Sequence, residues 1–174
     1  MTPNNIIFLD IDEVLNSISS SIWNKQRKVS PFDFEGFNPI SVALLRKLVE
    51  LADAKIVLSS TWRLHYDTFE QCHNEFEAKF EKLYGWEEFP IIGMTPELNY
   101  CHGSRDTRGR EIEHWLSNNE YKNFVIIDDS CDMMAHQLSN FVRIDYRNGF
   151  DFNNMLDCLE ILEVNDEILR LKNR

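Results

Sequence analysis

Three short stretches of the chain are almost continuously apolar, and polar residues follow each of them directly. These stretches are residues 6–9, 55–58 and 124–127. Apolar runs of this length, rich in β-branched residues, predict strands that are buried on both faces. Two weaker runs predict a short strand or connector over 89–94 and a further strand over 141–145.

Between the runs, apolar residues recur every three or four positions, which is the spacing of an amphipathic helix. This spacing predicts helices over residues 39–52, 66–84, 111–116, 133–138 and 153–171. Asn38 and Pro39 provide an N-cap and a first-turn proline for the first of these helices. Gly85 ends the second helix, and residues 104–109 are predicted to form a polar turn.

The alternation of buried strands with amphipathic helices indicates an α/β fold, with a mostly parallel central sheet and helices on both faces. We expect residues 1–174 to form one such domain, because this length supports one sizeable core. Residues 17–37 lack a clean period and are predicted to be an irregular loop, with room for one short helix over 18–26. Residues 62–103 could supply a small lid.

The chain is acidic, with 29 Asp and Glu against 18 Lys and Arg and a net charge of −11. Such a charge disfavours broad binding to nucleic acid or to an anionic membrane, although a local basic groove would still admit a nucleic-acid substrate. No apolar run approaches the roughly 18 residues of a membrane span. The four cysteines are widely spaced, with no CxxC pair and no signal peptide, which is typical of reduced thiols. We therefore expect a cytoplasmic protein; the pattern does not predict its oligomeric state.

The chemistry is concentrated where the three strong strands end. Asp10 and Asp12 follow the first strand, serine hydroxyls follow the second, and Asp128 and Asp129 follow the third. In a parallel sheet these carboxyl ends meet at one edge, where ligands bind. If the first strand continued through them, Asp10 and Asp12 would face the same side.

Four carboxylates at one edge require a counter-ion, and hard carboxylate oxygens at this density suit Mg²⁺. Serine hydroxyls and an arginine can bind the oxygens of a phosphate group. Asp10 could then act as a nucleophile, and Asp12 could act as the general acid and base. The residues thus predict a phosphoryl-transfer site.

Three segments resemble motifs I, II and IV of the haloacid dehalogenase-like (HAD) phosphatase superfamily. They are Leu9-Asp10-Ile11-Asp12, Leu58-Ser59-Ser60-Thr61 and Ile126-Ile127-Asp128-Asp129. The resemblance implies a HAD-like Rossmannoid fold with a minimal cap or none. It also implies a Mg²⁺-dependent phosphatase that hydrolyses a phosphate monoester through an aspartyl-phosphate on Asp10.

The same resemblance assigns roles to the remaining site residues. Asp12 would be the general acid/base, and its backbone carbonyl would join Asp10 as a metal ligand. Asp128 and Asp129 would be the acidic pair that holds Mg²⁺, with Asp129 in direct contact. Ser59 would bind the phosphate, and Ser60 is the alternative.

Motif III requires a lysine or arginine before motif IV, and Arg105, Arg108 and Arg110 are the candidates. We favour Arg108, because the start of the predicted helix would add to its attraction for phosphate. The segments 59–63 and 108–116 are also similar to the small HAD domains found in or beside RNA-repair proteins. Within them, Trp62 and Arg63 either line the substrate entrance or pack and pair behind motif II.

One position departs from the family pattern. A glycine usually follows the second aspartate of motif I and permits a sharp turn, whereas this chain has Glu13. Glu13 either adds a fifth carboxylate near the metal or points away along the loop. It supports an alternative function, a catalytically weak HAD-like domain that binds a phosphate group or a protein. Asp132 either reaches the metal through water or caps a helix.

The short segment after motif I is too small for a full cap domain. An open site of this kind suits a nucleic-acid end, a nucleotide or a phosphoprotein as the substrate.

Overall fold

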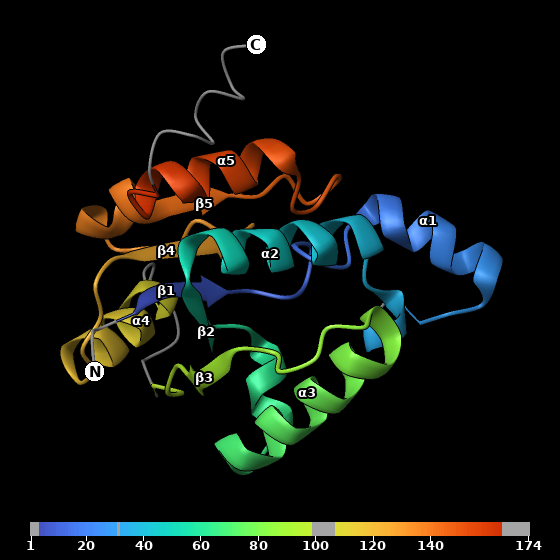
Figure 1. Ribbon diagram of the computed structural model, residues 1–174, viewed down its shortest axis with the longest axis horizontal. Coiled ribbons are helices and arrows are strands. Elements are labelled where there is room, and N and C mark those ends of the chain that lie inside the picture. The colour runs from blue at the N-terminus through green and yellow to red at the C-terminus, as the bar shows by residue number, and fades with distance from the viewer. Residues whose placement is uncertain (1–3, 31, 99–106, 165–174) are drawn as a thin grey trace.

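The structure is a computed structural model that describes residues 4–30, 32–98 and 107–164. Five strands form one sheet in the order β3-β2-β1-β4-β5, and every neighbouring pair is parallel (Figure 1). The strands are β1 (Asn5–Leu9), β2 (Ala54–Leu58), β3 (Ile91–Met94), β4 (Phe124–Asp128) and β5 (Phe141–Arg143). The predicted α/β fold with a parallel central sheet is therefore confirmed.

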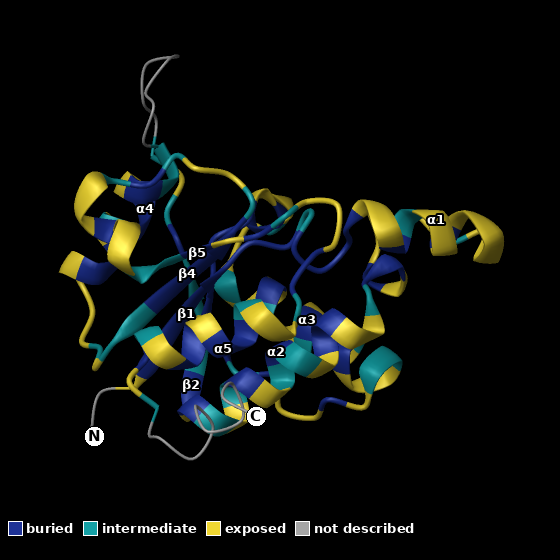
Figure 2. Ribbon diagram, turned by 90° about the horizontal axis from the view of Figure 1, so that it is seen from above, coloured by how far each residue is buried: buried dark blue, intermediate teal, exposed yellow. Residues whose placement is uncertain are grey.

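Helices cover both faces of this sheet. The helices of the described chain are α1 (Ile18–Arg27), α2 (Pro39–Ala52), α3 (Phe69–Tyr84), α4 (Thr107–Ser117) and α5 (Phe152–Ile161), with short 3₁₀ turns η1 (Phe34–Gly36), η2 (Thr61–His65) and η3 (Ala135–Asn140). Of these helices, α1 lies beyond the carboxyl ends of the strands (Figures 1 and 2). Because successive side chains of a strand point to opposite faces, Ile7 and Leu9 of β1 enter the large core shared with α2, α3 and α5. Ile6 and Phe8 enter the smaller core beneath α4.

The helix ends follow the signals in the sequence. The Asn38 side chain accepts a hydrogen bond from the backbone N–H of Ile40 (3.0 Å), so it caps α2 as predicted. A capping box formed by Thr68 and Gln71 starts α3, and Gly85 ends it in the left-handed conformation with φ of 60°.

Residues 62–98 are built into the body of the domain. β3 is an edge strand of the sheet, and the aromatic side chains of α3 enter the large core. The rings of Phe80 and Phe89 stack with their centroids 4.0 Å apart. A lid formed by residues 62–103 stays a prediction, and residues 99–103 lie outside the described residues.

Several predicted boundaries are wrong. β1 ends at Leu9, so Asp10 and Asp12 do not share a strand face. Helix α4 already begins at Thr107, within the predicted turn, and the remainder of that turn lies outside the described residues. Helix α5 ends at Ile161 rather than at residue 171, with Glu163 in the left-handed conformation (φ of 55°). Acidic residues at the carboxyl end of a helix oppose its dipole, which favours this early end.

Candidate active site

The ends of β2, β1 and β4 bring the predicted motifs together. Hydrogen bonds beyond the strands keep the chain segments aligned: the Asp10 N–H donates to the Ile127 carbonyl (3.0 Å) and the Ser59 N–H donates to the Leu9 carbonyl (2.9 Å). Carboxylate oxygens of Asp10, Asp128 and Asp129 all lie within 4.8 Å of one another. Residues 118 positions apart in the chain thus share one site.

Arg108 is the cation that the fold delivers to this cluster. Its Nη1 lies 3.5 Å from Asp10 Oδ1, and its Nε lies 3.5 Å from Asp128 Oδ2. Arg110 is exposed on α4, and Arg105 lies outside the described residues. Of the candidate arginines that the structure describes, Arg108 is the one that lies beside the carboxylate cluster, and its role as the motif III residue stays a prediction.

The first turn of α4 is fixed by the segment that follows motif IV. Asp132 Oδ2 accepts a hydrogen bond from the Arg108 N–H (3.2 Å), and the Asp132 carbonyl accepts one from the Gly109 N–H (3.1 Å). A Cβ at position 109 would lie 2.5 Å from the backbone nitrogen of Met134, so glycine permits this approach. Asp132 thus caps α4; its contact with a metal through water stays a prediction.

The charges of the cluster do not balance. Burial raises the pKa of Asp10 and of Asp128, the neighbouring charge of Asp10 raises that of Asp128 further, and Arg108 opposes both shifts. Burial also raises the pKa of Asp129. Three carboxylates against one guanidinium leave two negative charges when all are ionised. An oxygen-only donor set with this excess fits a divalent hard cation such as Mg²⁺.

Four polar atoms in and around the site are buried and lack a hydrogen-bond partner. They are Ser59 Oγ, Arg108 Nη1, Asp128 Oδ2 and Asp132 Oδ1. Buried polar groups are nearly always hydrogen-bonded, so this concentration suits a bound phosphate and metal ion. Ser60 differs, because its side chain hydrogen-bonds to Asp10 and accepts a hydrogen bond from the Trp62 N–H (3.3 Å). Ser59 is therefore the better placed of the two serines to bind phosphate.

Asp12 stands apart from the carboxylate cluster. Its Oδ1 accepts hydrogen bonds from Trp62 Nε1 (3.0 Å) and from Asn16 Nδ2 (2.8 Å). The Trp62 ring is buried and packs against Phe34 and Phe37, with centroid distances of 5.2 and 5.3 Å. Of the two alternatives for Trp62, the structure shows the one behind motif II. Sequence reasoning missed Asn16.

Arg63 also packs behind motif II. Its Nη2 lies 2.7 Å from Glu111 Oε2, and both side chains are at least 90% buried. The Arg63 Nη1 donates to the Ser60 carbonyl (2.8 Å), and Glu111 Oε1 accepts from the Leu98 N–H (3.3 Å). This buried ion pair ties the loop of motif II to α4, the helix that carries Arg108.

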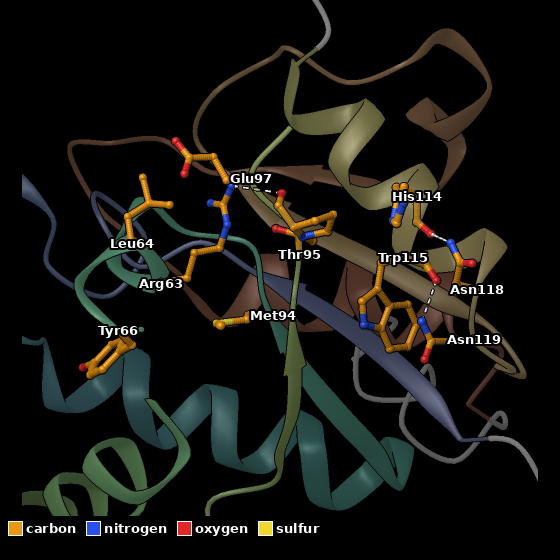
Figure 3. Close-up of a pocket in the computed structure, with 11 residues that line it drawn as sticks. Arg63, Leu64, Tyr66, Met94, Thr95, Glu97, His114, Trp115, Asn118 and Asn119 are labelled. Atoms are coloured by element: carbon orange, nitrogen blue, oxygen red, sulfur yellow. Dashed lines mark hydrogen bonds between the residues drawn. The ribbon is translucent and has the colours of Figure 1, made fainter. Parts of the chain in front are cut away.

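A groove of about 540 Å³ runs beside the Arg63 ion pair. In Figure 3, Arg63, Leu64 and Glu97 lie at one end and Trp115 and Asn119 at the other. Its lining residues come from η2 and the residue after it, from the end of β3 and the segment that follows, and from α4 and the residues just after it. They include none of the clustered carboxylates.

Glu13 adopts the conformation that a glycine would favour. Its φ is 62°, and its N–H donates to Asn16 Oδ1 (2.6 Å), which fixes the turn after motif I. Burial, Asp129 and Asp12 all raise the pKa of the Glu13 carboxyl, so this group lies on the acidic side of the loop. The turn therefore forms without the glycine.

The Rossmann-like parallel sheet, with acidic residues and a serine at its strand ends, is consistent with the HAD class of α/β domains. Residues 6–155 match the model of the family described as "HAD domain in Swiss Army Knife RNA repair proteins", and the chain belongs to this family. Comparisons with curated proteins and with solved structures gave no match. In the described residues, no helix has the length and apolarity needed to span a membrane.

Proposed function

We propose that this protein is a Mg²⁺-dependent phosphatase that hydrolyses a phosphate monoester through an aspartyl-phosphate on Asp10. The family supports a HAD-type phosphatase at the level of the superfamily. The observation that carries the proposal is the cluster of Asp10, Asp128 and Asp129 around Arg108, beside a buried Ser59 hydroxyl without a partner.

In the first step, the Asp10 carboxylate attacks phosphorus and the bond between phosphorus and the ester oxygen breaks. Asp12 gives its proton to the departing oxygen, which leaves as an alcohol. In the second step, Asp12 takes a proton from water, the water oxygen attacks phosphorus, and the bond between phosphorus and the Asp10 oxygen breaks. Inorganic phosphate leaves, and both aspartates return to their starting forms.

Asp10, Asp128, Asp129 and the backbone carbonyl of Asp12 would hold the Mg²⁺. The bound ion would neutralise negative charge on the carboxylates and on the phosphate oxygens. Ser59 and Arg108 would bind the other phosphate oxygens, with Ser60 keeping Asp10 oriented through its hydrogen bond.

We infer that the substrate is a nucleic-acid end in preference to a nucleotide or a phosphoprotein. The family to which the chain belongs consists of HAD domains in RNA-repair proteins. A single domain over residues 1–174 and a cytoplasmic location are part of the same proposal.

The alternative is a catalytically weak domain that binds a phosphate group or a protein. Glu13 favours it, because a further carboxylate beside Asp12 and Asp129 adds negative charge where phosphate must approach. The two functions differ in turnover, which the following assay measures.

Hydrolysis of p-nitrophenyl phosphate, with and without Mg²⁺, tests the enzyme. We expect metal-dependent turnover that Asp10→Asn abolishes and Asp12→Asn reduces by about 10²- to 10⁴-fold. Asp145→Asn is the control, since this aspartate is paired with Arg147 on the surface. Equal rates for wild type and Asp10→Asn would refute the phosphatase function and favour the alternative, a domain that binds a phosphate group or a protein. A panel of 3′- and 5′-phosphorylated oligonucleotides, nucleotides, sugar phosphates and phosphopeptides then ranks the substrates.

A further inference from the structure

Helix α1 exposes its apolar side chains and buries polar ones. Its buried residues are Ser20 and Asn24, whereas Ile22 is 59% exposed and Trp23 is 70% exposed. The buried side chains are satisfied, because Ser20 Oγ donates to the Ser17 carbonyl and Asn24 Nδ2 donates to the Gly36 carbonyl, each at 2.7 Å. A helix that displays tryptophan and isoleucine in this way is typical of an interaction surface.

The charge of this segment is opposite to that of the protein. Residues 14–32 contain no aspartate or glutamate, although the whole chain has a net charge of −11. Lys25, Arg27 and Lys28 are exposed, and none of them forms an ion pair within the described part of the chain. The residues of α1 and its C-cap therefore form a local basic surface, which the acidic side chains of Asp33 and Glu35 border on the side of Arg27.

The position of α1 connects this surface with the active site. It is the first helix after Asp10 and Asp12, and Figures 1 and 2 both show it standing out beyond the carboxyl ends of the strands. Its first turn is anchored, because the N–H groups of Ile18 and Ser19 donate to the carbonyls of Tyr146 and Arg147, each at 3.1 Å.

We propose that α1 binds a single-stranded nucleic acid whose terminal phosphate enters the Asp10 site. This inference rests on the proposed phosphatase function and adds the surface that holds the strand. Trp23 stacks on a base, and Lys25, Arg27 and Lys28 contact the phosphates behind the terminal one. Charge complementarity selects this partner, because a second copy of the chain would bring a further excess of negative charge.

Binding is tested with a fluorescent single-stranded oligonucleotide and the Asp10→Asn protein, which holds the strand without turnover. We expect Trp23→Ala to weaken the Kd measured by anisotropy about tenfold. Lys25→Glu should weaken it and lower the slope of log Kd against log salt by about 0.7, the value for one phosphate contact on a single strand. Lys122→Glu is the matched control, since Lys122 is exposed at the opposite edge, before β4, and carries the same charge change.

Turnover separates this inference from the phosphatase itself. We expect Trp23→Ala to lower the ratio of kcat/KM for a phosphorylated oligonucleotide to kcat/KM for p-nitrophenyl phosphate by about tenfold. Equal losses on the two substrates, or Lys25→Glu and Lys122→Glu weakening binding equally, would overturn the role of α1. Trp23-dependent self-association or binding to anionic vesicles, without oligonucleotide binding, would also overturn it. Absence of any hydrolysis by the wild type would overturn the proposed phosphatase function, and the anisotropy measurements would still test whether α1 binds the oligonucleotide.

Discussion

Replacement of Trp62 by phenylalanine isolates one hydrogen bond at the proposed general acid. The substitution keeps an aromatic ring beside Phe34 and Phe37 but removes the indole N–H that lies 3.0 Å from Asp12 Oδ1. Asn16 then remains as the one side-chain donor that the described residues direct at this oxygen. Asp12 loses part of its fixed orientation toward the substrate.

The magnitude follows from the kind of bond that is lost. In the transition state of the first step Asp12 gives up its proton and becomes a carboxylate, and a hydrogen bond to a charged group contributes about 1.5–3 kcal/mol. If the transition state depends fully on the orientation of Asp12, the rate of phosphoryl transfer falls by about 10- to 100-fold. The loss should appear in kcat rather than in KM, because Asp12 is separate from the residues that bind phosphate.

The assay compares two leaving groups in single-turnover experiments, which report the first chemical step alone. An alkyl phosphate needs a proton on its departing oxygen, whereas p-nitrophenolate is stable without one. We therefore expect Trp62→Phe to slow the alkyl phosphate by the full amount and p-nitrophenyl phosphate much less.

Trp86→Phe is the matched control, because Trp86 is buried in the same aromatic cluster, against Phe80 and Phe89. Both variants should lose stability, yet the leaving-group dependence should change for Trp62→Phe alone. The same loss for both leaving groups, or the same behaviour in both variants, would refute a role of Trp62 in positioning Asp12.

Three further predictions concern stability. Glu13→Gly should raise the free energy of unfolding in urea by about 1 kcal/mol, because glycine adopts a positive φ without steric cost, whereas Glu13→Ala keeps that cost and should not reproduce the gain. Glu111→Gln should lower the free energy of unfolding by about 3–5 kcal/mol, since it leaves Arg63 buried without a counter-charge. The double variant Arg63→Met, Glu111→Leu should recover most of this loss, because it leaves no buried charge. The metal-free protein should lose stability as the pH rises from about 4 to about 7. Burial first, and then the charge of Asp10, raises the pKa of Asp128 from 3.8 to about 7 in the folded state. In this pH range the folded state therefore keeps a proton that the unfolded state has released. Mg²⁺ should therefore raise the Tm more at pH 8 than at pH 5. The stability of Asp128→Asn should depend less on pH than that of the wild type, and an equal pH dependence would contradict this reasoning.

The sequence predicted those parts of the fold that depend on local pattern. The apolar runs that became β1, β2 and β4 need no knowledge of their partners, because burial on both faces requires apolar residues at every position. The hydroxyls and carboxylates at their ends could be assigned to one edge, because the carboxyl ends of parallel strands meet there. Asn38 and Gly85 likewise marked helix ends through short-range hydrogen bonds.

Contacts between distant side chains were beyond the sequence. The hydrogen bond from Trp62 to Asp12 spans 50 positions, and the ion pair of Arg63 with Glu111 spans 48.

Residues 18–26 were predicted to have room for a helix, but periodicity would bury Ile18 and Ile22, which the structure exposes. The net charge of −11 likewise gave no sign of the acid-free segment around α1.

The strand order has a consequence for how the chain folds. β1 pairs with β2 across about 50 positions and with β4 across 118, as in the pair of Ile6 and Phe124. Such non-local parallel pairings form slowly, because the entropy of closing the long loop is lost before the stabilising contacts between the strands form. The metal cluster requires both Asp10 and Asp128, so it is complete only once β4 has docked beside β1. The ion therefore joins a sheet that is already formed, and we expect Mg²⁺ to slow unfolding while leaving the refolding rate nearly unchanged.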